Sequence, residues 1–283
     1  MKTLQIIKQD QDKTISLVEH ETTHTKYIQK ELNYYDKTLY QTLQKIKNPY
    51  LPKIFVIQEN DNHLTLIEEY IEGKTLDQQS FSKEQVKDIT HQLCECLDSL
   101  HKLNPPIIHR DIKPENIIYH DNKVTLLDFG IARFLDSKKS KDTLILGSVG
   151  YAAPEQFGFQ QSNPQTDIYA LGKLMNYLLN GSLEHQNNIP FDLKQVILKA
   201  TQLDYKNRYN SVKEMDLAIQ QKLVVIPPFN NDTFKSKMIS LAWIVFTLMI
   251  VVDMEPGETI NNSFIIEPLI TEVTRFLGTG FYR

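Results

Sequence analysis

A short stretch of the chain carries polar side chains whose types and spacing could do chemistry: Asp111, Asn116 and Asp128. Between Asn116 and Asp128, two apolar pairs flank the polar turn His120-Asp121-Asn122-Lys123, a pattern that predicts a hairpin of two short buried strands. Such a hairpin would bring the three oxygen-bearing side chains to one edge. Carboxylate and amide oxygens at that edge could bind a hard cation such as Mg²⁺.

The motifs around these residues resemble those of one enzyme family. His109-Arg110-Asp111 with Asn116 is similar to the H-R-D-x-x-x-x-N catalytic loop of protein kinases, and Asp128-Phe129-Gly130 is similar to their D-F-G. Ala153-Pro154-Glu155 resembles the A-P-E that ends their activation segment. Residues 167–172 and 204–209 resemble two later segments of protein kinases and follow in the same order as in that family. Over residues 1–222 the chain resembles the bacterial eukaryotic-like (Hanks-type) serine/threonine protein kinases.

This resemblance implies an α+β, two-lobed, protein-kinase-like fold. Residues 1–72 would form the small lobe, a β-sheet with one helix, and residues 73–222 the larger, mainly helical lobe. The site would lie between the lobes and use ATP with Mg²⁺, with Mn²⁺ as an alternative metal.

Each residue of the catalytic loop then has an expected role. Asp111 would accept the proton of the attacking hydroxyl or orient that hydroxyl, and Lys113 would bring positive charge to the transferred phosphoryl group. A basic residue at position 113 resembles serine/threonine rather than tyrosine kinases. Asn116 and Asp128 would be the metal ligands and thereby help to bind the nucleotide.

Other residues would support this loop or regulate it. Arg110 could be paired by a phosphorylated activation loop, for which Ser137, Ser140 and Thr143 are candidate acceptors; each could also be an ordinary solvated turn residue. Ser148 corresponds to a family hydroxyl that contacts Asp111 and Lys113. The resemblance also implies structural support by three further residues, His109, Phe129 and Asp167, the last of which braces the catalytic loop. It implies one ion pair as well, between Arg208 and Glu155.

The nucleotide side of the site departs from the family. The chain has no glycine before Gly73, and the turn 9–13, which replaces the glycine-rich loop, contains two aspartates. Lys30 is the expected ligand of the α- and β-phosphates, although it could instead be a surface lysine beside Glu31. The helix glutamate that should pair with this lysine is missing. Asp36 lies on nearly the same helix face and could pair with the lysine instead, but its side chain is shorter and it lies about one turn early.

The adenine pocket is closer to the family pattern. Residues 66–73 resemble the strand and hinge that offer backbone groups of Glu69 and Ile71 to the adenine. Glu68 then stands at the gatekeeper position, where an apolar residue is more usual. A carboxylate there should either pair with Lys30 or have a raised pKa, so we hypothesise that Glu68 partly replaces the missing helix glutamate.

The elements that must position these residues follow from periodicity. Alternating patterns predict strands over 4–7, 14–18, 26–30, 54–58 and 63–69. Apolar residues at helical spacing predict a helix from Tyr34 to Ile46, stopped by Pro49. Ser82 and Gln85 form a predicted capping box that opens a long helix.

Composition sets limits on the class of protein. The 283 residues are 41% hydrophobic, enough for a large core, and the net charge of −4 suggests no general affinity for nucleic acid. The two cysteines, Cys94 and Cys96, suit a reducing compartment. The polar N-terminus does not resemble a secretion signal.

The C-terminal residues differ from the rest. Residues 223–237 read as a juxtamembrane linker, and the fifteen residues 238–252 contain no charge. A membrane span usually needs about 17–25 residues, so this run is short, but lysines at 235 and 237 could extend it. The alternative is an apolar helix that packs on the large lobe or on a partner. Lysines before the run, and acids in the tail 253–283 after it, predict a single-pass protein of the cell membrane with its kinase domain in the cytoplasm.

Three functions remain open from the sequence. The first is a membrane-anchored serine/threonine protein kinase with protein substrates and a homodimer for autophosphorylation. The second is a pseudokinase or nucleotide-binding scaffold, favoured by the absent glycine loop and helix glutamate. The third is a small-molecule phosphotransferase, which the long activation segment disfavours.

Overall fold

The computed structural model describes residues 1–60, 63–135, 147–158, 160–183 and 189–221. The chain divides into two compact units, 1–216 and 217–283. All described site residues belong to the first unit. Of the second unit, only residues 217–221 are described.

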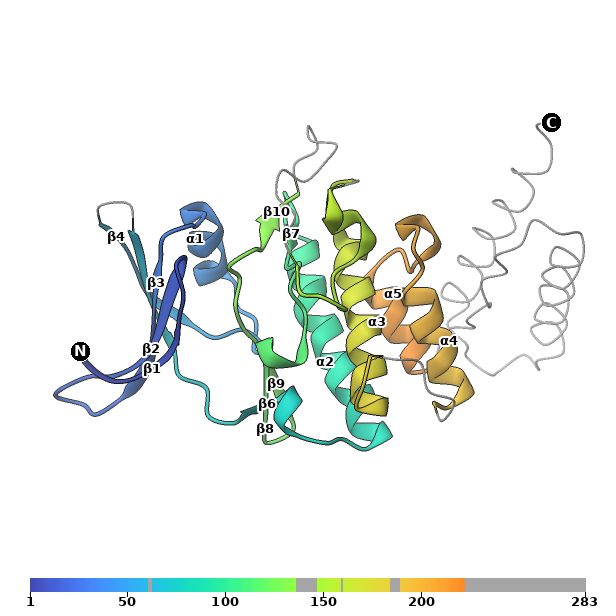
Figure 1. Cartoon of the computed structure of the whole chain (residues 1–283), viewed down its shortest axis with the longest axis horizontal. Helices are drawn as coiled ribbons and strands as arrows, with labels where there is room; N and C mark the ends of the chain where they lie inside the picture. The colour runs from blue at the N-terminus through green and yellow to red at the C-terminus, as the bar shows by residue number, and fades with distance from the viewer. Residues whose placement is uncertain (61–62, 136–146, 159, 184–188, 222–283) are drawn as a thin grey trace, which may run out of the picture. The chain divides into compact units, whose positions relative to one another are not determined.

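The first part of the chain forms the β-sheet lobe that the sequence predicts (Figure 1). Its antiparallel strands lie in the order β1-β2-β3-β5-β4. Their bounds are β1 (Lys2–Gln9), β2 (Lys13–Glu19), β3 (Lys26–Leu32), β4 (Ile54–Asn60) and β5 (His63–Glu69). Because Ile28 lies opposite Glu68 across β3 and β5, Lys30 projects from the same face of the sheet as Glu68.

Helix α1 (Lys37–Lys45) packs beside this sheet and is shorter than predicted. Its N-cap is Asp36, whose carboxylate accepts a hydrogen bond from the backbone N–H of Leu39 at 3.1 Å. An aspartate at the N-cap satisfies an otherwise unpaired helix amide, so the helix begins after Tyr34 and Tyr35. This cap corrects the idea that Asp36 substitutes for the missing glutamate, because its carboxylate is used at the helix end.

The second lobe is mainly helical, as predicted (Figure 1). Its helices are α2 (Lys83–His101), α3 (Pro164–Asn180), α4 (Phe191–Ala200) and α5 (Val212–Ile219). The predicted capping box opens α2: Gln85 N–H donates to Ser82 Oγ at 3.2 Å, and Ser82 N–H donates to Gln85 Oε1 at 2.9 Å. The remaining short elements are β6 (Lys74–Thr75), η1 (Leu76–Gln78), β7 (Ile107–Ile108), η2 (Pro114–Asn116), β8 (Ile117–His120), β9 (Lys123–Leu126), β10 (Arg133–Phe134), η3 (Pro154–Phe157) and η4 (Tyr205–Asn207).

The predicted hairpin is formed by β8 and β9. Asp121 and Asn122 in its turn both have positive φ, 48° and 58°, as a two-residue type I′ hairpin turn requires. The hairpin joins Asn116 at one end to Asp128 just beyond the other, so both polar residues lie at the same edge. The apolar residues at 117, 124 and 126 are fully buried and fix this edge against the helices.

Helices α3 and α4 approach each other closely at Gly172. A Cβ there would lie 2.8 Å from Ala200 Cβ, so only glycine allows this contact. In the first turn of the same helix, Thr166 and Asp167 are fully buried. The core therefore positions a carboxylate beneath the catalytic loop.

None of the helices in the described ranges is long and apolar enough to cross a membrane. The predicted span at 238–252, its linker 223–237 and the tail 253–283 lie outside the described residues.

Candidate active site

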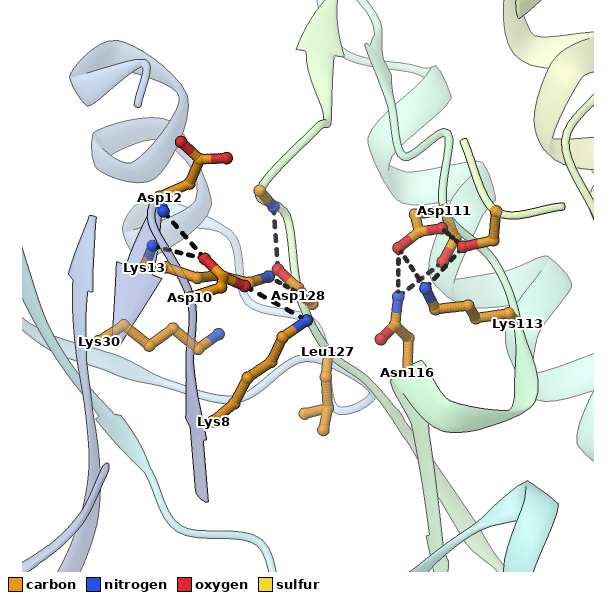
Figure 2. Close-up of polar contacts among 12 residues, drawn as sticks. Lys8, Asp10, Asp12, Lys13, Lys30, Asp111, Lys113, Asn116, Leu127 and Asp128 are labelled. Atoms are coloured by element: carbon orange, nitrogen blue, oxygen red, sulfur yellow. Dashed lines mark hydrogen bonds and ion pairs between the residues drawn. The ribbon is translucent and has the colours of Figure 1, made fainter. Parts of the chain in front are cut away.

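Three polar side chains of the catalytic loop, Asp111, Lys113 and Asn116, lie together (Figure 2), and Ser148 of the activation segment contacts two of them. Ser148 Oγ donates a hydrogen bond to Asp111 Oδ1 at 2.6 Å, and Lys113 Nζ donates to Ser148 Oγ at 2.6 Å. Lys113 Nζ also lies 3.1 Å from Asp111 Oδ2. Asn116 Nδ2 donates to the same Oδ2 at 2.8 Å and to the Asp111 carbonyl at 2.9 Å. Asp111 is therefore fixed from three sides, with one hydroxyl already hydrogen-bonded to its carboxylate.

Asp167 holds the backbone of this loop from below. Its carboxylate accepts hydrogen bonds from the N–H of His109 at 2.9 Å and of Arg110 at 2.8 Å, and His101 Nε2 lies 2.8 Å away. Arg110 has φ of 70°, a left-handed conformation that non-glycine residues rarely adopt. Burial acts to raise the pKa of Asp167, but hydrogen bonding and charge from His101 outweigh it, so the pKa is lowered.

His109 and Phe129 form the apolar support of the same loop. Their rings meet edge to face, with centroids 4.7 Å apart, and both are buried. This contact ties the catalytic loop to the segment that carries Asp128.

Glu155 and Arg208 form a buried bidentate ion pair. Arg208 Nη1 and Nη2 donate to the two carboxylate oxygens at 2.7 and 2.8 Å. Arg208 also donates to three backbone carbonyls, at Gln165, Gln202 and Leu203. The pair thus anchors the end of the activation segment to the loop before α5.

On the small-lobe side, Lys30 pairs with Glu68. Lys30 Nζ lies 2.7 Å from Glu68 Oε2, and only 7% and 4% of the two residues are exposed. Burial acts to lower the pKa of Lys30, but attraction to Glu68 and Asp128 is stronger, so the pKa is raised. Lys30 is therefore not a surface lysine beside Glu31, and Glu68 occupies the place of the absent helix glutamate.

Lys13 is a site residue that the sequence reasoning missed. From the first position of β2 its Nζ reaches Asp128 Oδ2 at 2.5 Å (Figure 2). Burial acts to raise the pKa of Asp128, but the charges of Lys30 and Lys13 lower it to about 2. The available signal was the position of Lys13 as the one basic residue in the turn that replaces the glycine loop.

The turn 9–13 is closed by the side chain of Asp10. Asp10 Oδ1 accepts hydrogen bonds from the N–H groups of Asp12 and Lys13 at 3.0 and 2.9 Å. The Asp12 amide is the main reason that the pKa of Asp10 is lowered. These two amides are therefore already hydrogen-bonded. The turn presents the carboxylate of Asp10 instead of free N–H donors.

The residues predicted to form the hinge and to bind the metal lie on separate segments of the chain. Glu69 ends β5, where its N–H donates to the Lys53 carbonyl at 2.8 Å, and Ile71 follows in the segment toward β6. The Nδ2 group of Asn116 faces Asp111, and its amide oxygen points away from Asp111 (Figure 2). Mg²⁺ is commonly held by one or two oxygen side chains plus substrate phosphates, which the pair Asn116 and Asp128 fits. The phosphorylation candidates Ser137, Ser140 and Thr143 lie outside the described residues.

Comparison with known proteins agrees with this geometry. A family model described as "Protein kinase domain" matches residues 6–242. Serine/threonine-protein kinase D of Synechocystis is 34% identical over 197 residues, which cover 61% of this chain and 38% of that protein. The probable serine/threonine-protein kinase PknB of Lactococcus lactis is 28% identical over 236 residues, covering 69% and 37%. PrkC of Bacillus subtilis is 30% identical over 210 residues, covering 64% and 32%. The matched regions span less than half the length of these relatives.

Proposed function

Because this chain belongs to the protein kinase family, we propose that it transfers the γ-phosphate of ATP, with Mg²⁺, to serine or threonine hydroxyls of proteins. The observation that carries the proposal is the hydrogen bond from Ser148 Oγ to Asp111 Oδ1, because it shows a carboxylate that accepts a hydrogen bond from an alcohol. Lys113 lies beside both groups and supplies the positive charge that phosphoryl transfer needs.

The roles of the chain's own groups follow from this arrangement. Asp111 would accept the hydrogen bond of the substrate hydroxyl and then its proton, while Lys113 would stabilise charge on the transferred group. Asn116 and Asp128 would hold the metal, which neutralises charge on the triphosphate when bound. Lys30, oriented by Glu68, would bind the α- and β-phosphates, and the backbone at Glu69 and Ile71 would bind the adenine.

A phosphoryl-transfer assay with the full-length chain tests this function. With radiolabelled ATP and Mg²⁺ or Mn²⁺, we expect phosphoserine or phosphothreonine on the chain itself or on a general protein substrate. Asp111→Asn should lower the rate by about 10²-fold or more, as expected for loss of a general base. Asp121→Asn in the exposed hairpin turn is the matched control, because asparagine tolerates the positive φ there. Nucleotide binding without transfer in the wild-type chain would contradict the proposal.

That contrary outcome would favour the second candidate, a pseudokinase or nucleotide-binding scaffold. Two observations support this candidate: the turn amides are occupied by Asp10, and Asp128 is paired with Lys13 rather than open to a metal.

We also propose that residues 238–252 anchor the chain in the cell membrane, with the kinase domain in the cytoplasm and residues 253–283 outside. The fifteen uncharged residues and the two preceding lysines support this topology. Cleavage of a C-terminal tag by protease added to intact cells would agree with this topology, whereas protection of the tag, or recovery of the full chain in the soluble fraction, would contradict it. If two copies phosphorylate each other in a homodimer, wild-type chains should transfer phosphate to Asp111→Asn chains.

A further inference from the structure

The nucleotide side of this site lacks the usual donors for phosphate. A glycine-rich loop binds phosphate through backbone N–H groups that approach closely because no side chain intervenes. Here residues 10–13 carry side chains throughout, and Asp10 accepts the amides of Asp12 and Lys13. Any phosphate above Asp128 must therefore be bound mainly by side-chain charge.

Lys13 is the cation placed for that task. It begins β2, directly after the turn, and its side chain extends from the small lobe to Asp128 (Figure 2). Its Nζ lies 2.5 Å from Asp128 Oδ2, and the side chain is 17% exposed. A Cβ built on Gly130 would lie 3.7 Å from Nζ, so the ammonium stands directly over the D-F-G turn.

Lys30 differs from Lys13 in its surroundings. Lys30 pairs with Glu68 within the sheet, whereas Lys13 pairs with Asp128, the residue expected to bind metal. A divalent cation on Asp128 would remove the partner of Lys13 and leave a mobile ammonium beside the triphosphate. A lysine suits such an exchange because it is a compact charge on a flexible stem with three donors.

We propose that Lys13 is a phosphate-binding residue that replaces the missing glycine-loop amides, and that it exchanges Asp128 for the phosphates when Mg·ATP binds. In the nucleotide-free protein Lys13 occupies the carboxylate that the metal needs, so metal and Lys13 compete for Asp128. This inference rests on the proposed use of ATP but does not require that phosphate be transferred.

The exchange predicts opposite effects of one substitution on two ligands. With Lys13→Met, affinity for the non-hydrolysable analogue AMP-PNP with Mg²⁺ should fall about tenfold or more, the usual loss for a charged hydrogen bond. Affinity of the nucleotide-free chain for Mn²⁺ alone should instead rise, because the competing ammonium is gone. Calorimetric titration of the full-length chain measures the first constant, and the electron paramagnetic resonance of free Mn²⁺ measures the second.

Lys8→Met is the matched control. Lys8 lies on the neighbouring strand, is more exposed and pairs with Asp10 at 3.7 Å, so its loss should change either constant by less than about twofold. Should Lys13→Met fail to fold, Lys13→Gln repeats the test with a shorter polar side chain, and a melting curve without ligand monitors folding.

Unchanged AMP-PNP affinity in the Lys13 variant would overturn the proposal, and so would unchanged or weaker Mn²⁺ affinity. A purely structural role for Lys13 predicts a lower melting temperature without these opposite shifts. A wild-type chain that binds AMP-PNP but transfers no phosphate would contradict the proposed kinase activity while leaving the role of Lys13 intact. A wild-type chain that binds no AMP-PNP would overturn both.

Discussion

Lys30 and Glu68 form their ion pair within one β-sheet, across the adjacent strands β3 and β5. In protein kinases the corresponding lysine pairs with a glutamate of the small-lobe helix, so the position of that helix controls the pair. Here helix α1 contributes no carboxylate to Lys30, since Asp36 caps the helix and Glu68 comes from the sheet. The orientation of Lys30 is therefore built into the sheet and does not depend on movement of α1.

The first prediction concerns Glu68→Gln. The substitution removes the charge that balances a buried lysine, so we expect the free energy of unfolding to fall by about 2 kcal/mol and kcat/KM for ATP to fall about tenfold. Urea denaturation and steady-state kinetics measure the two effects. Glu31→Gln, exposed on the neighbouring strand, should change neither, and equal kinetics for Glu68→Gln and wild type would show that Glu68 does not support Lys30.

The sequence predicted those parts of the structure that depend on local pattern. The hairpin β8–β9, the capping box of α2 and the sheet lobe follow from turn residues, capping residues and alternation, all of which act over a few positions. The start of α1 was misplaced because aromatic spacing outweighed the N-cap signal of Asp36. The contact between Lys13 and Asp128 joins residues 115 positions apart, and no local pattern in a single sequence indicates such a pair.

A second prediction follows from the bridging position of Ser148. Its hydroxyl links Asp111 and Lys113 through two bonds of 2.6 Å and touches neither Lys30 nor Asp128 in the described structure. Ser148→Ala should therefore lower kcat about tenfold through loss of positioning, while KM for ATP stays within about twofold. Ser148→Thr keeps the hydroxyl and should retain most activity. A rise in KM with unchanged kcat would contradict this role.

A third prediction concerns acid stability through Asp167. The folded-state pKa of this carboxyl is lowered, so its contribution to stability is present above the unfolded value of 3.8 and is lost as pH falls through the folded value. In Asp167→Asn an amide group must face at least one backbone donor of His109 or Arg110, which should cost about 1–3 kcal/mol at neutral pH. Urea denaturation from pH 7 to pH 3 measures the difference in the free energy of unfolding between wild type and variant, which should narrow only below about pH 4. A difference that is constant over this range would contradict the pKa shift.

The fourth prediction concerns the buried pair of Glu155 and Arg208. Arg208→Ala leaves a carboxylate without its partner in a site where 4% of Glu155 is exposed, and it also removes donors to three carbonyls. We expect the free energy of unfolding to fall by about 3–5 kcal/mol, measured by urea denaturation. Arg208→Lys keeps the charge but not the two parallel bonds, so it should recover only part of this loss. Lys206→Ala, an exposed residue of the same turn, should change stability by less than about 0.5 kcal/mol. If Arg208→Lys were as stable as wild type, charge alone rather than bidentate geometry would anchor the end of the activation segment.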